Sequence, residues 1–552
     1  FQKAPKSEGI AGPELSRLAA AATTQARGLL ETEGYFEPAI KVMQSTSADD
    51  LPRIVMSVVP GPRVRVASVS IESTEPLAVR AATRDEPSSD RLTQLRHDWP
   101  LRVGQPFRQA TWSGAKAATL ADLRADGYPT ASWRSTHAGI DAVAGTAALD
   151  VIAEPGPLYR LGAIRVEGTS RYDVDTVRRL ATFYPGAVYS ERLLLDYQER
   201  LVKVGLFEGA SVELDASGSP EAAPVNVKVT ELSRHQATFG IGYSANTGPR
   251  VSVEHYDRRV FGQPWIAHST LSLGPGLKSI GTELASYPAE NMWRNLVGAN
   301  VERLRSADEL RDSWSARVGR SQETTRFDRL YDVELAHARI TSSVFVDTAT
   351  AVSTNYHWLR RDLDSVLVPT EGTALSAQAG VGYGKGTETL FGVAGETERR
   401  GPFVRAYTRF TAYKPFGGWY GNARIEAGQV FVTSRIAVPD TILFRAGGDD
   451  SVRGYDYRTL GPRVGGAVVG GRVLLTGSVE VEHSLTRRVP ALLGAIFVDA
   501  GNAADRWNEL RPFLGYGVGL HYRSPVGPLK LDLAYGQNER RLRVHVSVGV
   551  NF

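Results

Sequence analysis

The feature that most constrains the fold is a two-residue alternation of apolar and polar side chains from residue 234 to residue 552. Such a period is typical of β-strands, whose successive side chains point to opposite faces. In the last segment one face is polar or small, and the other consists of Leu542, Val544, Val546, Val548, Val550 and Phe552. The pattern predicts sixteen strands, which begin near residues 236, 249, 264, 276, 295, 310, 326, 344, 373, 402, 419, 471, 491, 512, 527 and 542.

These segments favour an antiparallel transmembrane β-barrel over a soluble β-sandwich. Many are about ten to twelve residues long, the length that a tilted strand needs to cross a bilayer. Glycines and charged residues share the predicted inward face, which suits a wet lumen, whereas the inner face of a sandwich is apolar. The mean hydropathy of −0.21 is compatible with a barrel, because lipid-facing residues alternate with polar ones. The even strand number agrees with this interpretation.

A unit that occurs three times precedes the alternating region. Each copy has a helical pattern that ends near a glycine, Gly34, Gly127 or Gly205, and then two short alternating segments. The second and third copies open with predicted strands at Arg63–Glu72 and Tyr159–Glu167. The order of strand, helices and hairpin predicts an α+β module. The first copy has no opening strand and is expected to be incomplete.

Four domains follow from these patterns: modules at 1–61, 62–156 and 157–233, and a barrel at 234–552 with a long loop at 432–470. The chain starts with Phe1 and has no signal peptide, so we expect a processed or trimmed product. The absence of cysteine is compatible with the periplasm. The net charge of +4 is small and its basic residues are scattered, so no nucleic-acid partner is expected.

The sequence carries no recognisable catalytic, metal or cofactor signature. Its ten histidines form no metal-ligand pairs, and no Gly-x-Ser-x-Gly turn occurs. The glycine runs Gly380–Gly384 and Gly515–Gly519 lie inside predicted strands, where they are expected to make room in the lumen or let the sheet bend. We therefore expect a protein that is not an enzyme and that needs no cofactor or metal.

The loop 432–470 has an unusual tip at residues 447–455, where Arg453 stands between an acidic turn and a glycine. An arginine led into the lumen would be costly without carboxylate partners, and its fork of donors fits them well. Glu480 lies on the inward face of the next strand, and Asp499 ends the strand after that. On the residues alone, three unrelated charges lining a wet pore remain an equal alternative.

The tip resembles the motif of the sixth extracellular loop in the outer-membrane barrel-assembly superfamily, whose members carry N-terminal POTRA domains. The matching residues are Asp449, Ser451, Val452, Arg453, Gly454 and Tyr455. With three repeats and the segments 476–480 and 524–532, the chain is most similar to the TamA family, the outer-membrane subunits of the translocation and assembly module. The resemblance implies that Arg453 folds back toward Asp499 and Glu480, and that Phe552 is the family's C-terminal aromatic residue.

The resemblance also implies a function and a location. We expect an assembly factor that helps unfolded β-barrel substrates such as autotransporters enter the bilayer of the Gram-negative outer membrane, with its N-terminal domains in the periplasm. A TamB-like partner anchored in the inner membrane is implied as well. The alternatives are a polypeptide secretion pore of the two-partner type and a passive porin-like channel, although the latter would not need three periplasmic modules.

A weak seam between the first and last strands would give such a function a physical basis. Barrel closure depends on the backbone hydrogen bonds that these two strands share. Glycines give a strand little side-chain support, and an incoming strand can add to an open edge by β-augmentation. The residues expected at the seam are Gly240, Gly242, Gly549 and Phe552.

Overall fold

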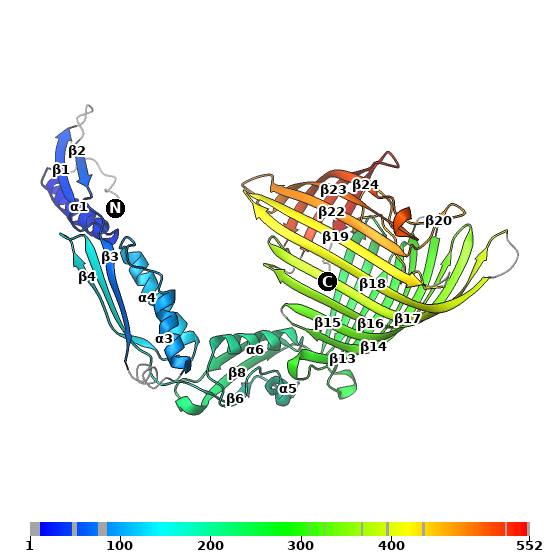
Figure 1. Ribbon diagram of the computed structural model, residues 1–552, viewed down its shortest axis with the longest axis horizontal. Helices are drawn as coiled ribbons and strands as arrows, with labels where there is room; N and C mark the ends of the chain where they lie inside the picture. Colours follow the sequence, from blue (N-terminus) through cyan, green and yellow to red (C-terminus); the bar gives the residue numbers. More distant parts are fainter. Residues whose placement is uncertain are drawn as a thin grey trace. The chain divides into compact units, whose positions relative to one another are not determined.

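The computed structural model describes residues 12–46, 52–74, 86–306, 309–324, 326–365, 368–392, 397–432, 437–524 and 527–548 (Figure 1). The chain divides into two compact units. One contains residues 1–168, 181–199 and 209–229, and the other contains residues 169–180, 200–208 and 230–552. No helix among the described residues is both long enough and apolar enough to cross a membrane.

The region before the barrel contains three successive groups of helices and strands. The first comprises α1 (Gly12–Thr32), β1 (Ala39–Thr46) and β2 (Pro52–Val59). The second comprises β3 (Arg65–Ser73), α3 (Glu86–Asp98), α4 (Gln109–Ala125), β4 (Ser132–Asp141) and β5 (Thr146–Glu154). The third comprises β6 (Leu161–Glu167), α5 (Val174–Arg179), α6 (Glu191–Lys203), β7 (Phe207–Leu214) and β8 (Ala223–Glu231).

The second and third groups share one topology. Each has a three-stranded sheet, ordered β3-β5-β4 or β6-β8-β7, in which the first and last strands of the group run parallel. The apolar residues that alternate along β5 are buried against the helices, and Trp99 and Trp112 pack edge to face at 6.0 Å in the same core. The predicted order of strand, helices and hairpin is therefore confirmed for these two groups.

Sixteen antiparallel strands form the barrel, as the alternation predicted (Figure 1). They are β9 (His235–Ser244), β10 (Gly248–Asp257), β11 (Trp265–Leu273), β12 (Leu277–Ser286), β13 (Trp293–Ser306), β14 (Glu309–Glu323), β15 (Phe327–Thr341), β16 (Phe345–Leu363), β17 (Gly372–Leu390), β18 (Thr397–Phe416), β19 (Trp419–Val432), β22 (Val473–Ser484), β23 (Leu492–Ala504), β24 (Phe513–Ser524), β25 (Gly527–Gly536) and β26 (Arg541–Val548). We call the end at which β9 begins the proximal end and the opposite end the distal end.

Strands β16 to β18 are longer than the sequence pattern predicted, with 19, 19 and 20 residues. Their register continues to the distal ends, where Phe345 pairs with Leu390 and Glu388 pairs with Thr397. Continued pairing satisfies backbone N–H and C=O groups that would otherwise need other partners. The strand ends are therefore set by backbone hydrogen bonding as well as by the apolar band that the sequence reveals.

The junction between β8 and β9 is held by side chains that bond to the backbone. Arg258, at the proximal end of the barrel, donates to the carbonyl oxygens of Gly205 and Ser233 at 2.7 and 3.0 Å. Glu231 accepts from the N–H groups of residues 170–172 at 2.8 to 2.9 Å. Burial alone would raise the pKa of the Glu231 carboxyl, but these hydrogen bonds outweigh burial and lower the pKa.

Candidate functional site

The long loop between β19 and β22 is the sixth loop at the distal end, and its described part, residues 437–472, is packed rather than exposed. It contains the short hairpin of β20 (Arg463–Val464) and β21 (Ala467–Val468). Val452 and Tyr455 of the tip are fully buried, in one apolar cluster with Phe403 and Leu474 of the barrel wall. This buried apolar surface holds the tip inside the barrel.

Arg453 lies in the lumen, 6% exposed, with its guanidinium on the carboxylate of Asp499 in β23. Nε donates to Oδ2 at 2.7 Å and Nη2 donates to Oδ1 at 2.9 Å, so the pair is bidentate. The backbone N–H of Arg453 donates to the same Oδ2 at 3.0 Å. The structure therefore brings together Arg453 and Asp499, with Asp499 bonded to the backbone as well as to the side chain of the tip.

The remaining donors of Arg453 reach two further strands. Nη1 donates to Oε2 of Glu480 in β22 at 2.6 Å and to Oδ2 of Asp532 in β25 at 3.0 Å. The guanidinium carbon lies 3.4 Å from the centroid of the Phe497 ring, which adds a cation–π contact. Glu480 was among the partners expected for Arg453, whereas Asp532 was not predicted as a partner. Asp532 does alternate with Leu531 and Leu533, so the strand that carries it was predicted.

Further ionic residues surround Arg453 and Asp499, and we call all of these charged residues together the lumen cluster. His521 presents Nδ1 to Glu482 at 2.6 Å and Nε2 to Asp532 at 2.8 Å. With Glu482 and Asp532 both ionised, each carboxylate can only accept, so both ring nitrogens donate, which requires the imidazolium form of His521. The lumen cluster is then balanced, with the four cations Arg453, Arg523, Lys530 and His521 against the four carboxylates Glu480, Glu482, Asp499 and Asp532.

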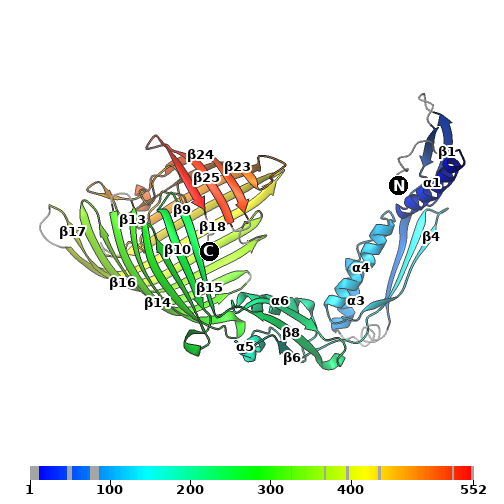
Figure 2. The ribbon, with the colours of Figure 1, turned by 180° about the vertical axis from the view of Figure 1, so that it is seen from behind.

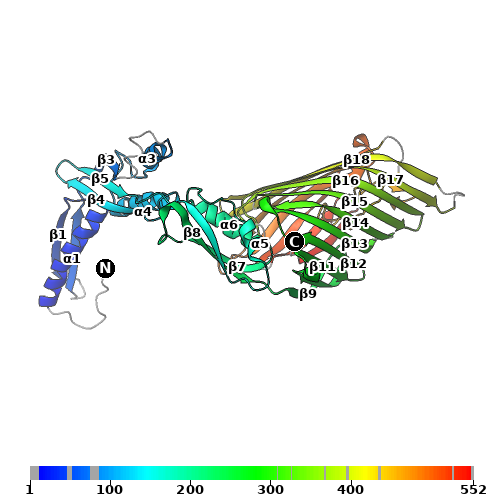
Figure 3. The same cartoon turned by 90° about the horizontal axis from the view of Figure 1, so that it is seen from below.

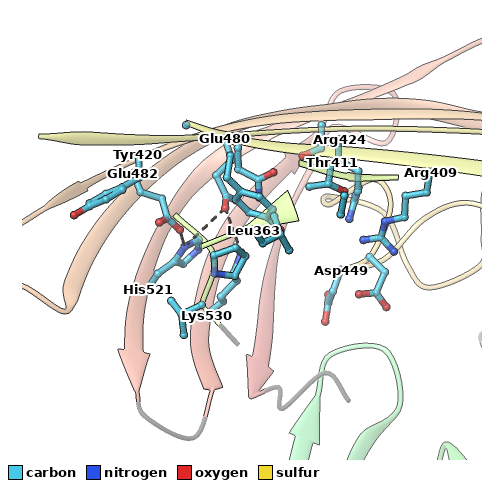
Figure 4. Close-up of a pocket in the computed structure, with 18 of the residues that line it drawn as sticks. Leu363, Arg409, Thr411, Tyr420, Arg424, Asp449, Glu480, Glu482, His521 and Lys530 are labelled. Carbon is cyan, nitrogen blue, oxygen red and sulfur yellow. Dashed lines mark hydrogen bonds and ion pairs between the residues drawn. The ribbon is translucent and has the colours of Figure 1, made fainter. Parts of the chain in front are cut away.

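A cavity of about 610 Å³ adjoins the lumen cluster on its proximal side. Figure 4 shows Glu482 and His521 directed toward each other at this cavity, with Arg409 and Asp449 lying apart from them. Among the described residues, Glu480, Glu482 and His521 are the group whose ligand atoms lie close enough to hold a metal ion. Their carboxylates already bind Lys530 and Arg523 at 3.2 and 2.9 Å, so the group has cations of its own.

Two glycines give the tip its close fit to the wall. A Cβ at Gly515 of β24 would lie 1.9 Å from the carbonyl oxygen of Arg453. Gly454 has a φ of +93°, a conformation that favours glycine, and a Cβ there would lie 2.7 Å from the backbone nitrogen of Gly536. Glycines inside predicted strands were expected to make room in the lumen, and Gly515 makes room for the backbone of Arg453.

The tip also contacts both sides of the junction between β26 and β9. On the β26 side, the Asp449 carboxylate pairs with Nδ1 of His545, and Gly454 donates its N–H to Nε2 of His545 at 2.9 Å. On the β9 side, the N–H of Asp449 donates to Oδ1 of Asn246 at 3.2 Å. Asp449 and Gly454 were recognised as motif residues, but neither Asn246 nor His545 was predicted as a partner.

Figure 2 shows the green strand β9 near the red strands at the end of the barrel. The seam between β26 and β9 has little described pairing. Among the described residues, β26 and β9 share one register pair, Ser547 with Ser244. Just beyond the end of β9, the N–H of Ala245 donates to the carbonyl of Val546 at 3.2 Å. Gly240 and Gly242 pair with β10, and no described partner on β26 faces them. The other two expected seam residues, Gly549 and Phe552, lie outside the described residues.

Asp440 is a second buried attachment of the loop that the sequence did not reveal. Its carboxylate, 3% exposed, accepts from Arg445 at 2.9 Å and from Arg311 of β14 at 3.3 Å, and it also pairs with Arg458. Arg445 in turn donates to Glu309 of β14 at 2.7 Å. The loop is therefore bound to β14 as well as to β22, β23 and β25. In this second group the three carboxylates Asp440, Glu302 and Glu309 balance the three arginines Arg311, Arg445 and Arg458.

We expect Asp440→Asn to loosen the part of the loop bound to β14. The change keeps the shape but removes the charge that faces three arginines, and breaking a buried ionic group costs about 3–5 kcal/mol. Limited proteolysis of the folded barrel should cut the loop faster. Asp505→Asn is the matched control, because the Asp505 carboxylate is 45% exposed in its pair with Arg472, and it should leave the cleavage rate unchanged. Equal rates for both variants would show that Asp440 does not fasten the loop.

Comparison with known proteins identifies this architecture. The model of the Omp85 superfamily domain matches residues 230–552, which cover the entire barrel. The chain belongs to the Omp85 superfamily. The POTRA family model, described as a surface antigen variable number repeat, matches residues 159–232 of this Omp85 chain. It is thus an outer membrane protein with periplasmic POTRA structure, and because the POTRA match leads directly into β9, the proximal end of the barrel is periplasmic and the distal end extracellular.

Individual relatives of the Omp85 chain are distant. It is 23% identical over 410 residues to the outer membrane protein assembly factor BamA of Nitratidesulfovibrio vulgaris, covering 69% of this chain and 49% of that protein. It is 35% identical over 118 residues to the chloroplastic outer envelope protein 80 of Arabidopsis thaliana, covering 19% and 14% of the two chains. The chain thus spans about half the length of the first of these relatives and less of the second.

Among solved structures, BamA from Haemophilus ducreyi lacking POTRA domains 1–3 is similar to this chain with a TM-score of 0.63. The two are 16% identical, and the match covers 87% of this chain and 98% of the other. At this level of identity the likeness concerns the fold. It agrees with the sixteen-stranded barrel that the sequence predicted.

Proposed function

We propose that this Omp85 protein assembles other β-barrel proteins into the outer membrane by letting its seam open toward the bilayer. The observation that carries the proposal is the tip of the long loop, which binds His545 of β26 and Asn246 beside β9 where these strands share one described register pair. A seam with few backbone bonds offers unpaired strand edges, to which an incoming strand can add. Movement of the tip would then control access to those edges.

The substrate and partner that we propose are those of the TamA family. Its substrates would be unfolded β-barrel proteins such as autotransporters, and its partner would be a TamB-like periplasmic protein anchored in the inner membrane. The proposal takes the chain as three POTRA-like modules, at 1–61, 62–156 and 157–233, before the barrel at 234–552. Support comes from the tip motif and from the two described groups with complete POTRA-like topology, β3 to β5 and β6 to β8.

Reconstitution into liposomes tests the assembly function. Unfolded outer-membrane barrel protein should become inserted, as judged by its heat-modifiable gel mobility, several times faster with this chain present than with empty liposomes. The matched control is a porin of similar barrel size at the same protein-to-lipid ratio. Equal insertion rates with the two proteins would contradict the proposal.

Ion conductance separates an assembly barrel from an open channel. The loop fills the lumen with a buried apolar cluster and a balanced set of charges, so the intact protein should conduct poorly in planar bilayers. Replacing residues 447–455 with a glycine-serine linker should raise the conductance. A large, steady conductance of the unaltered protein would instead favour the passive channel, and export of a soluble polypeptide from loaded liposomes would favour the secretion pore.

A further inference from the structure

Three arginines face outward from neighbouring strands near the periplasmic end of the barrel. They are Arg320 in β14, Arg329 in β15 and Arg360 in β16, and Figure 3 shows these strands side by side. By strand alternation Arg320 shares the lipid-facing side with the exposed Val318, and Arg329 shares it with the exposed Val333. The arginines therefore project toward the membrane rather than into the lumen.

No carboxylate pairs with these arginines among the described residues. The ion pairs found in that part of the chain include none of the three, and Nε of Arg329 is buried without a hydrogen-bond partner. At the extracellular end of the same wall, by contrast, the outward-facing Arg303 is paired with Asp312 at 2.5 Å. A guanidinium on a lipid-facing surface needs an anion or water, so the three arginines must find theirs outside the protein.

Aromatic rings fix two of these side chains at the surface. The guanidinium of Arg320 lies over the Trp293 ring, 5.5 Å from its centroid, and that of Arg329 lies 4.5 Å from the centroid of Phe327. Trp293 continues into an aromatic row, with Tyr331 at 5.8 Å. Such rings concentrate at membrane–water interfaces, where one side is apolar and the other polar.

The spacing along β14 places Arg320 at the level of lipid headgroups. Arg320 and Asp312 face outward eight residues apart, with Trp314, Ala316 and Val318 between them. At about 3.4 Å per residue and a tilt of about 40°, these eight residues span roughly 20 Å of membrane thickness, close to the apolar band of an outer-membrane barrel. Since β14 ends at the periplasmic side, Arg320 lies at the periplasmic boundary of that band.

A groove of about 410 Å³ lies beside Arg320 on the outer surface of β13 to β16. Toward the periplasm the groove is lined by Trp293, Arg320 and Tyr331, and toward the middle of the membrane by Val318, Val333 and Thr354. Asp332 borders the groove but belongs to the inward face, where its carboxylate accepts from Asn355 at 3.0 Å. The groove therefore offers one cation at its polar end and an apolar floor beyond it.

We propose that this groove binds a phospholipid of the periplasmic leaflet. Its phosphodiester accepts hydrogen bonds from Arg320, and its first acyl carbons lie along Val318 and Val333. Arg329 and Arg360 extend the cationic band and favour an anionic headgroup such as phosphatidylglycerol. The site lies on β13 to β16, away from the seam of β9 and β26, so a bound lipid would hold this wall at a fixed depth while the seam moves.

Native mass spectrometry of the full chain in detergent, titrated with phosphatidylglycerol, tests the proposal. Arg320→Gln should weaken retention of the lipid by about tenfold, the loss expected for one charge-assisted contact. Arg320→Lys, which keeps the charge, should bind more tightly than Arg320→Gln. Arg303→Gln is the matched control, because it removes an outward arginine that already has a carboxylate partner, and its affinity should equal that of the unaltered protein.

Two results would overturn the proposal. One is equal lipid retention by the Arg320→Gln and Arg303→Gln variants, with both shown to be folded by heat-modifiable mobility. The other is displacement of the lipid by millimolar inorganic phosphate, because the apolar floor is expected to make the phospholipid bind far more tightly than the free anion. If Arg320→Gln does not fold, lipid retention by Arg320→Lys is compared with that by Arg303→Gln instead. A tenfold weaker retention by the lysine variant, which keeps the charge, would also contradict a charge-based site.

Discussion

Arg453→Lys is expected to abolish most of the assembly activity while leaving the barrel folded. Arg453 satisfies Asp499, Glu480 and Asp532 at once, through a planar fork that a single ammonium group cannot reproduce. Glu480 and Asp532 also pair with Lys530 and His521, whereas Arg453 is the cation that binds Asp499. Loss of the bidentate pair with Asp499 therefore leaves a poorly compensated buried charge, which costs about 3–5 kcal/mol. The cost falls on the position of the tip, because the barrel strands keep their own backbone pairing.

Arg453→Ala should be at least as damaging, since it removes the cation that the three carboxylates share. The measurement is the rate at which the variant inserts a substrate barrel into liposomes, with its own folding checked by gel mobility. Arg463→Lys is the matched control within the same loop, because Arg463 is exposed and its guanidinium donates to the carbonyl of Gly466 at 3.0 Å. If both lysine variants assemble substrate at the native rate, the planar guanidinium of Arg453 is not needed for function.

A cysteine pair can report the position of the tip directly. This chain has no cysteine, so residues 453 and 499 can be replaced without background. The backbone N–H of Arg453 bonds to the Asp499 side chain at 3.0 Å, which brings the two residues close enough for the strict geometry of a disulfide to be tried. Crosslinking in the folded protein would support a tip that resides in the lumen, and failure to crosslink under any oxidising condition would count against it.

The sequence revealed the barrel because lipid and lumen impose opposite demands on successive side chains. That alternation survives even where strands such as β17 are rich in glycine, so all sixteen strands were predicted. The three-part N-terminal region was visible for a different reason, since its helical periods end near glycines such as Gly127, whose φ of +85° suits the turn that follows. Both signals are local and need no knowledge of which strands meet.

The contacts of the loop could be predicted only where a motif or a strand register restricted them. Glu480 and Asp499 lie on strands that follow the loop directly, so their inward faces could be placed relative to Arg453. Asn246 and His545 approach the tip because the barrel closes, and closure brings together residues that lie 203 and 96 positions from Asp449. Asp440 lies in irregular chain without a period, where neither its burial nor its arginine partners leave a pattern.

The Asp440 group changes how the loop is expected to move. The Arg453 contacts fasten the tip to β22, β23 and β25, whereas Asp440 fastens the start of the loop to β14. Opening the lumen cluster alone therefore leaves the loop attached on the other side of the barrel. A tip that pivots in this way could release Asn246 and His545 without leaving the lumen, so the barrel could change its seam without becoming an open pore.

A disulfide across the seam should abolish assembly and should be reversible by reductant. Ser244 and Ser547 lie directly opposite each other in antiparallel strands, and the hydrogen bond from Ala245 to Val546 marks them as a non-hydrogen-bonded pair. In such pairs the Cα atoms are about 4.5 Å apart, which falls within the range that disulfides accept. The double variant Ser244→Cys/Ser547→Cys therefore offers a crosslink at the described contact between the first and last strands.

The oxidised variant would keep the two strand edges together, so no incoming strand could pair with them. We expect substrate insertion to fall to the level of empty liposomes when the disulfide forms and to recover when it is reduced. The pair Ser252→Cys/Ser272→Cys, at directly opposite positions on β10 and β11, is the control, because that ladder has seven consecutive register pairs and is not expected to open. A secretion pore would behave differently, since a polypeptide that passes through the lumen does not need the seam. Full activity of the oxidised seam variant would thus exclude lateral opening, while loss of activity in the seam variant but not in the control would locate the substrate's path at β9 and β26.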